Sequence, residues 1–138
     1  MSNKTIKALI VEDVFLIQRL LENILGPYAK CLGVANGTDA INTYTSHYFN
    51  GEPFDLVCLD IFLPGMDGIE VLQSIRDFED EINIDANERT KIVMVSSMAN
   101  HNMIKKAHQI GCNGYITKPF SKDEILNTLL TLGLIHSF

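Results

Sequence analysis

The chain has 138 residues, a length typical of one domain, and 46% of them are hydrophobic. A chain of about 150 residues buries roughly 68–70% of the surface that it exposes when unfolded, which argues against a disordered chain and against a need for disulfide cross-links. The formal net charge of −6 excludes a broad positive surface for nucleic acid or anionic lipid.

The spacing of the cysteines and the length of the hydrophobic runs indicate in which cellular compartment the protein works. Cys31, Cys58 and Cys112 are far apart and form no Cys-x-x-Cys pair, so a zinc site or a disulfide framework is not expected. The first hydrophobic run, residues 6–11, stops at Glu12, and no run approaches the roughly 20 residues of a membrane span. The sequence therefore predicts a soluble, cytoplasmic protein without a membrane partner.

The N-terminal part of the chain alternates strand patterns with helix patterns. Residues 6–11 (IKALIV) form a run too short for a helix and predict a buried strand. Hydrophobic residues at helical spacing over 17–24 predict a helix, which a Gly-Pro pair ends. Residues 30–35 predict a second strand, and one hydrophobic face over 41–48 predicts a second helix.

The same alternation continues to the end of the chain. The patterns predict strands over 54–59, 91–95 and 115–117, and helices over 71–78, 103–110 and 125–132. A capping box, Ser121-x-x-Glu124, opens the last helix. Between the third helix and the fourth strand, residues 77–90 predict a helix end and a longer loop. The acidic residues there predict a solvated helix face, made of Asp77, Glu79, Asp80 and Glu81.

Five strands that alternate with five helices predict a parallel sheet with helices on both faces. Parallel strands buried on both faces read as continuous hydrophobic runs, as residues 6–11 and 91–95 do. In such sheets ligands bind beyond the carboxyl ends of the strands. The residues that follow the strands are therefore the candidate site.

Polar side chains follow four of the predicted strands, namely Glu12 and Asp13, Asp60, Ser96, and Lys118. Because the carboxyl ends of parallel strands meet at one edge, we expect these groups to converge. Three converging carboxylates raise one another's pKa unless a cation neutralises them. Oxygen ligands without histidine or cysteine suit Mg²⁺. Carboxylates, Mg²⁺, a lysine and a hydroxyl together predict phosphoryl transfer to an aspartate nucleophile.

The sequence resembles the receiver domains of bacterial-type two-component response regulators, the CheY-like family. The resemblance runs from about Ile6 to Leu132. Its motifs, in order, are LIVED over 9–13, DLV over 55–57, DIFLPGMDG over 60–68, Val95-Ser96, and GCNGYITKPF over 111–120. It implies a flavodoxin-like, doubly wound five-stranded parallel sheet in the order 2-1-3-4-5 with five helices. It also implies a single receiver domain over 1–138, with a core of about 5–133 and no output domain.

The resemblance further implies a phosphoacceptor and its metal ligands. Asp60 matches the phosphorylated aspartate. Asp13 matches the residue that binds Mg²⁺ directly, and Asp60 is a second metal ligand. Glu12 matches the carboxylate that reaches the metal through water. Phe62, two residues after the acceptor, matches the position whose backbone carbonyl binds the metal. Asp13 is also a candidate cap for the first helix.

Three further positions match groups that bind and report the phosphoryl group. Lys118 matches the lysine that pairs with the phosphoryl group, and its peptide bond to Pro119 is typically cis in the family. Ser96 matches the hydroxyl that binds phosphate and switches; the next residue, Ser97, is a competitor at a position where the family usually has alanine or glycine. Tyr115 matches the switch aromatic that follows the hydroxyl.

The predicted function is a phosphoacceptor switch that assists its own phosphorylation and is not an enzyme. A histidine kinase or a histidine phosphotransfer protein donates the phosphoryl group to Asp60. The fourth helix, fifth strand and fifth helix then repack to signal to a downstream protein or to pass phosphate on in a relay. Dimerisation on phosphorylation, the kinase and the pathway stay open.

Two other readings compete with the switch. The receiver fold can act as a binding module without phosphorylation. An aspartate-nucleophile phosphatase of the haloacid-dehalogenase type has a similar sheet, but it requires a second aspartate where Phe62 stands.

Overall fold

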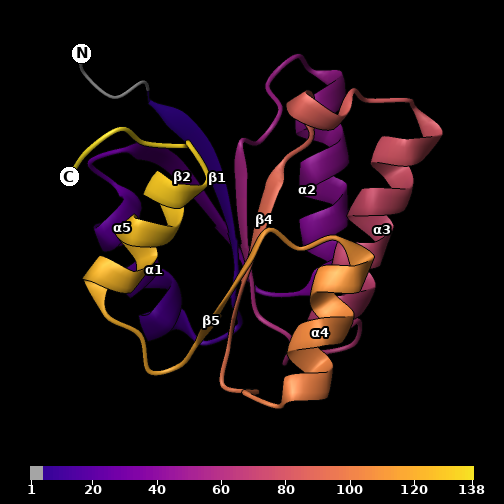
Figure 1. The fold of residues 1–138 in the computed structure, drawn as a ribbon. Helices are drawn as coiled ribbons and strands as arrows, with labels where there is room; N and C mark the ends of the chain where they lie inside the picture. Colours follow the sequence, from indigo (N-terminus) through magenta and orange to yellow (C-terminus); the bar gives the residue numbers. More distant parts are fainter. Residues whose placement is uncertain (1–4) are drawn as a thin grey trace.

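The computed structural model describes residues 5–138, which form an α/β fold (Figure 1). All strands are parallel and pair in the order β2-β1-β3-β4-β5. The strands are β1 (Ile6–Val11), β2 (Ala29–Val34), β3 (Leu56–Leu59), β4 (Lys91–Ser96) and β5 (Gly114–Thr117). The helices are α1 (Phe15–Leu25), α2 (Gly37–Phe49), α3 (Gly68–Glu81), the short 3₁₀ helix η1 (Ala86–Glu88), α4 (His101–Ile110) and α5 (Lys122–Thr131). The predicted flavodoxin-like fold and strand order are confirmed.

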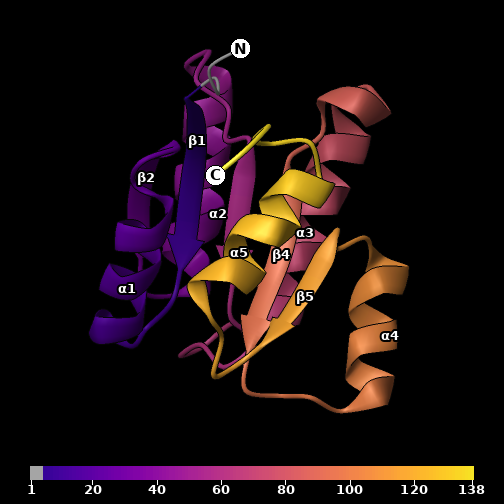
Figure 2. The same ribbon diagram turned by 60° about the vertical axis from the view of Figure 1, so that its left-hand side comes forward.

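The helices form two layers around the sheet. Figures 1 and 2 show α1 and α5 over one face and α2, α3 and α4 over the other. Successive side chains of a strand point to opposite faces. Ala8 and Ile10 of β1 therefore join the core on the α1/α5 side, and Leu9 and Val11 join the core on the other side.

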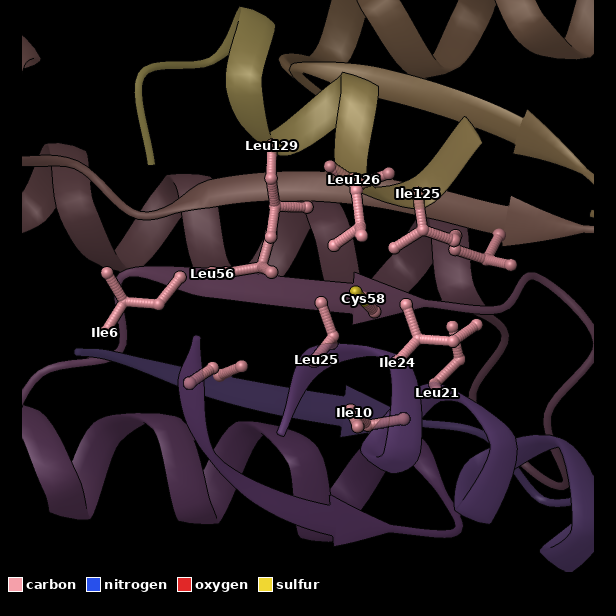
Figure 3. Packing of buried hydrophobic residues seen from close by; sticks show 14 of the residues in the cluster. Ile6, Ile10, Leu21, Ile24, Leu25, Leu56, Cys58, Ile125, Leu126 and Leu129 are labelled. Carbon is pink, nitrogen blue, oxygen red and sulfur yellow. The ribbon is translucent and has the colours of Figure 1, made fainter. Parts of the chain in front are cut away.

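The core between the sheet and the α1/α5 layer is packed with aliphatic side chains (Figure 3). The C-terminal segment contributes to it, because Ile135 is only 1% exposed. Leu132, Leu134 and Ile135 thus pack on the domain, whereas Phe138 is 53% exposed. The side chains that Figure 3 labels come from β1, α1, β3 and α5: Ile6, Ile10, Leu21, Ile24, Leu25, Leu56, Cys58, Ile125, Leu126 and Leu129.

Local signals set several helix boundaries. The predicted capping box forms, with Ser121 and Glu124 each bonding the other's backbone N–H. Asp67 caps α3 by accepting the Glu70 N–H at 3.0 Å. Gly111 ends α4 with a φ of 128°, a left-handed conformation that favours glycine. Within residues 5–138, no helix combines the length and hydrophobicity that a bilayer crossing needs.

The acidic stretch at the end of α3 differs from the prediction in one residue. Asp77, Asp80 and Glu81 are exposed, but Glu79 is fully buried. It lies one helical turn after Ile75, on the face of α3 that packs against the sheet. The prediction of a solvated face is therefore wrong at Glu79.

Glu79 is the centre of a buried polar network that makes its burial tolerable. Its carboxylate accepts hydrogen bonds from the Tyr44 hydroxyl at 3.0 Å and the Thr90 N–H at 2.9 Å. It also pairs with the Arg76 guanidinium at 2.6 Å. Burial raises the pKa of Tyr44, and the Glu79 carboxylate adds to this effect. Arg76 itself donates to the backbone oxygens of Thr90 and Gly111.

Removal of this carboxylate tests the network. Glu79→Ala leaves Arg76 as a buried charge without its ion-pair partner, and we expect a loss of about 3–5 kcal/mol in unfolding free energy. Asp77→Ala, on the exposed side of α3, is the control and should change it by no more than about 0.5 kcal/mol. Urea denaturation measures both. Equal effects of the two substitutions would contradict the assignment of Glu79 as a buried structural residue.

Candidate functional site

The sheet brings the predicted polar residues to one edge. Val11 of β1 pairs with Leu59 of β3, so Glu12 and Asp60 each lie one residue beyond paired neighbours. The Asp60 N–H donates to the Val11 oxygen at 3.1 Å, which fixes the backbone there. Glu12 and Asp60 are only 2% and 5% exposed, whereas Asp13 is exposed.

Three carboxylates form an acidic cluster at this edge. Glu12, Asp13 and Asp60 each offer one oxygen, and the three oxygens lie within 4.8 Å of one another. Burial raises the pKa of Glu12, with a contribution from Asp60 that Lys118 opposes. Among residues 5–138, no histidine or cysteine joins this group. An all-oxygen donor set of this size fits Mg²⁺, which prefers carboxylates and keeps further positions for water or phosphate oxygens.

Lys118 crosses from β5 to the acidic cluster. Its ammonium donates to Asp60 Oδ2 at 2.9 Å and also to Glu12 Oε1. Burial alone would lower the pKa of Lys118, but the two carboxylates outweigh it and raise that pKa. The lysine is therefore charged at neutral pH. Its backbone N–H donates to the Ser96 oxygen at 2.9 Å, and its peptide bond to Pro119 is cis, as expected.

Ser96 and Tyr115 both contact Met98, in the segment between β4 and α4. The Ser96 side chain is fully buried, and its oxygen accepts the Met98 N–H at 3.2 Å. The Tyr115 hydroxyl donates to the Met98 oxygen at 2.5 Å. The two candidate switch residues thus hold the same loop residue. Ser97, the competitor for the hydroxyl role, is exposed.

The structure places two further residues for which the sequence predicted roles beside Asp60, namely Phe62 and Asp13. The Phe62 N–H donates to Asp60 Oδ1 at 3.3 Å, while the Phe62 side chain is 53% exposed. Asp13 does not cap α1: the cap residue is Val14, one position later, whose backbone oxygen accepts the Gln18 N–H at 3.0 Å. The Val14 N–H donates to Glu12 Oε2 at 3.4 Å. The expectation that Asp13 caps α1 is therefore wrong, because the helix begins one residue too late for it.

The sequence reasoning missed the role of Gly68 beside Asp60. A Cβ at this position would lie 2.0 Å from the Asp60 backbone oxygen, so only glycine allows α3 to begin here. The Gly68 N–H also donates to the Ile61 oxygen at 2.9 Å. The Asp-Gly pair that ends the DIFLPGMDG motif was the available signal.

Comparison with known proteins identifies related sequences. The family model described as response regulator receiver domain matches residues 8–130. The chemotaxis protein CheY of Bacillus subtilis is 34% identical over 125 residues, which cover 89% of this chain and 93% of that protein. CheY of Halobacterium salinarum is 32% identical over 89% of this chain and 92% of its own length. The sensor histidine kinase GacS of Pseudomonas protegens is 34% identical over 94% of this chain, which spans 13% of that kinase.

Solved structures show the same fold. The CheX–CheY–BeF₃–Mg²⁺ complex from Borrelia burgdorferi aligns with a TM-score of 0.78 and 27% identity, over 93% of this chain and 89% of that chain. The receiver domain of the sensor histidine kinase PA1611 from Pseudomonas aeruginosa, with magnesium coordinated in its active-site cleft, aligns with a TM-score of 0.73 and 24% identity. That alignment covers 93% of this chain and 97% of that chain.

The contact at Gly68 gives a stability prediction. Gly68→Ala forces the start of α3 away from the Asp60 backbone, and we expect a loss of about 1–3 kcal/mol in unfolding free energy. Asn23→Ala is the control, because Asn23 is an exposed residue of α1, and it should change the value by no more than about 0.5 kcal/mol. Urea denaturation of both variants is the measurement. Wild-type stability of Gly68→Ala would show that the backbone there tolerates a side chain.

Proposed function

Because this chain belongs to the response regulator receiver domain family, we propose that it is a two-component signalling switch that accepts a phosphoryl group on Asp60. One observation carries this proposal. Asp60 is buried at the carboxyl end of β3, with Lys118 at 2.9 Å and the carboxylates of Glu12 and Asp13 beside it. This arrangement combines a nucleophile, a fixed positive charge and a set of oxygen ligands.

The acidic cluster is the proposed magnesium site. Asp13 and Asp60 would hold the ion directly, Glu12 would act through water, and the backbone carbonyl of Phe62 would be a further ligand. Bound Mg²⁺ supplies positive charge against the carboxylates and the phosphoryl oxygens. Related proteins support this assignment, since the structures of Borrelia burgdorferi CheY and of the PA1611 receiver are described with magnesium.

Asp60 acts as the nucleophile toward a phosphohistidine of a histidine kinase or a phosphotransfer protein. One carboxylate oxygen forms the new bond to phosphorus while the bond from phosphorus to the imidazole nitrogen breaks. The leaving imidazole keeps that electron pair. Lys118 moves its hydrogen bond from Asp60 Oδ2 to a phosphoryl oxygen, where its positive charge balances the charge that develops on the phosphoryl group. The chain thus supplies most of the groups for its own phosphorylation.

The signal leaves the site through Ser96 and Tyr115. The Ser96 hydroxyl turns to donate to a phosphoryl oxygen and gives up its bond with the Met98 N–H. Because Tyr115 bonds the same residue, movement of Met98 releases the tyrosine to follow. The face formed by α4, β5 and α5 then repacks for a downstream protein, a relay partner or a second copy of the chain.

The phosphoryl adduct is the decisive observable for this proposal. After incubation with Mg²⁺ and a small phosphodonor such as acetyl phosphate, intact mass should show one phosphoryl group on the wild type. Asp60→Asn should show none, because an amide is not a comparable nucleophile. The control Asp77→Asn, on the exposed side of α3, should match the wild type. If neither acetyl phosphate nor a phosphohistidine donor gives an adduct, the chain is a receiver fold that acts as a binding module without phosphorylation.

Magnesium should also stabilise the folded protein. Binding to the native state alone raises the unfolding free energy by about 2.7 kcal/mol at a concentration of 100 times Kd. Asp13→Asn should remove most of the rise in melting temperature that Mg²⁺ causes. Without metal, this substitution should not lower the melting temperature, because it removes one of three repelling charges. Differential scanning fluorimetry in Mg²⁺ and in chelator measures both; a Mg²⁺ effect that survives Asp13→Asn would place the ion elsewhere.

A further inference from the structure

Gln18 connects the first helix back to the end of the sheet. Its side-chain amide nitrogen donates to the Glu12 backbone oxygen and to the Val34 backbone oxygen, both at 3.1 Å. An amide nitrogen has two hydrogens, so both donors of Gln18 are used. The Glu12 oxygen lies directly after β1 and the Val34 oxygen is the last of β2, at the edge that carries the acidic cluster.

The two bonds are placed where the backbone ladder ends. Val11 and Val34 are the last paired residues of β1 and β2, and the Glu12 N–H then donates to the Val34 oxygen at 3.0 Å. Beyond this rung the chain leaves the sheet to enter α1 (Figure 2). The bond from the Gln18 amide to the Glu12 oxygen thus adds one more hydrogen bond beyond the last backbone–backbone bond between these two segments.

A second observation shows that β2 is built to receive this side chain. Gly33 lies beneath the amide, and a Cβ at Gly33 would be 2.3 Å from Gln18 Oε1 and 2.5 Å from its Cδ. A larger residue at position 33 therefore displaces the amide. Because the atoms in the way are the far end of a flexible side chain, the displacement costs the backbone little.

The segment that Gln18 restrains carries two ligands of the proposed magnesium site. Only Glu12, Asp13 and Val14 join β1 to α1. The side-chain contacts that hold this connection are the long hydrogen bond from the Val14 N–H to Glu12 Oε2, at 3.4 Å, and the two bonds of Gln18. Asp13 is exposed and does not cap α1, so Gln18 is the side chain that holds the connection from within the helix.

We infer that Gln18, seated on Gly33, is a positioning residue that holds the Glu12–Asp13 backbone in the conformation that binds Mg²⁺. This inference rests on the proposed function, since it concerns the same metal site. Gln18 does not touch the ion and acts through the backbone that carries its ligands. Loss of residues that orient metal ligands typically weakens metal binding by about 10–100-fold, and we expect a loss in that range.

Isothermal titration of the metal-free protein with Mg²⁺ tests the inference. Gln18→Met keeps the length of the side chain but has no N–H, and it should weaken Mg²⁺ binding at least about 10-fold. Gly33→Ala should do the same although Gln18 is intact, because the new methyl group displaces the amide. The double variant should bind no more weakly than the weaker single variant, since both act through one contact. Asn23→Ala, at an exposed position of α1, is the control and should bind like the wild type.

Melting temperatures in chelator separate positioning from a purely structural role. A structural role lowers the melting temperature and leaves the Mg²⁺ Kd unchanged, and that result for Gln18→Met or Gly33→Ala would overturn the inference while the proposed function stands. Additive effects in the double variant would also overturn it, because they exclude a shared contact. If the wild type itself does not bind Mg²⁺, the proposed metal site fails and this inference fails with it.

Discussion

Mutual repulsion among three carboxylates is the constraint on which the site depends. Oxygens of Glu12, Asp13 and Asp60 lie within 4.8 Å of one another, and two of these side chains are buried. The sheet holds them there because β1 and β3 are neighbours, and Lys118 offsets part of their charge from β5. A bound cation would relieve this repulsion. The proposed phosphoacceptor function rests on this local imbalance of charge.

The two ends of the α2/α3/α4 layer differ in what their polar groups do. At the carboxyl edge, the polar groups surround Asp60 and Met98 and leave charge incompletely balanced. At the far end of α3, Arg76 and Glu79 are buried and satisfied by hydrogen bonds. Arg76 also bonds the Gly111 oxygen and the Asn113 side chain, which ties the turn after α4 to α3. The end of α4 away from Asp60 is thus anchored by several hydrogen bonds. In the segment before α4, Ser96 and Tyr115 each make one hydrogen bond to the backbone of Met98.

Glycine has a comparable role at two places beside the site. At Gly68 the missing side chain lets α3 begin against the Asp60 backbone, and at Gly33 it lets the Gln18 amide lie on β2. In both cases a close approach between separate elements requires the glycine. These contacts help to set where the backbone of Asp60 and of Glu12 and Asp13 lies, although neither glycine carries a functional group.

The sequence by itself determined the alternating strands and helices, the parallel sheet and the set of residues at its edge. Continuous hydrophobic runs, helical stripes and the polar residues after the strands are local patterns, so their prediction needed no contacts between distant parts of the chain. The strand order came from the resemblance of the sequence motifs to receiver domains. The burial of Glu79, the lack of a cap at Asp13 and the fit of Gln18 on Gly33 were decided only by the tertiary structure. A glutamate in an acidic run reads as solvated until an arginine, a tyrosine and a backbone N–H from other segments surround it. Such contacts join residues that are far apart in the chain, so the spacing of residues along the sequence does not predict them.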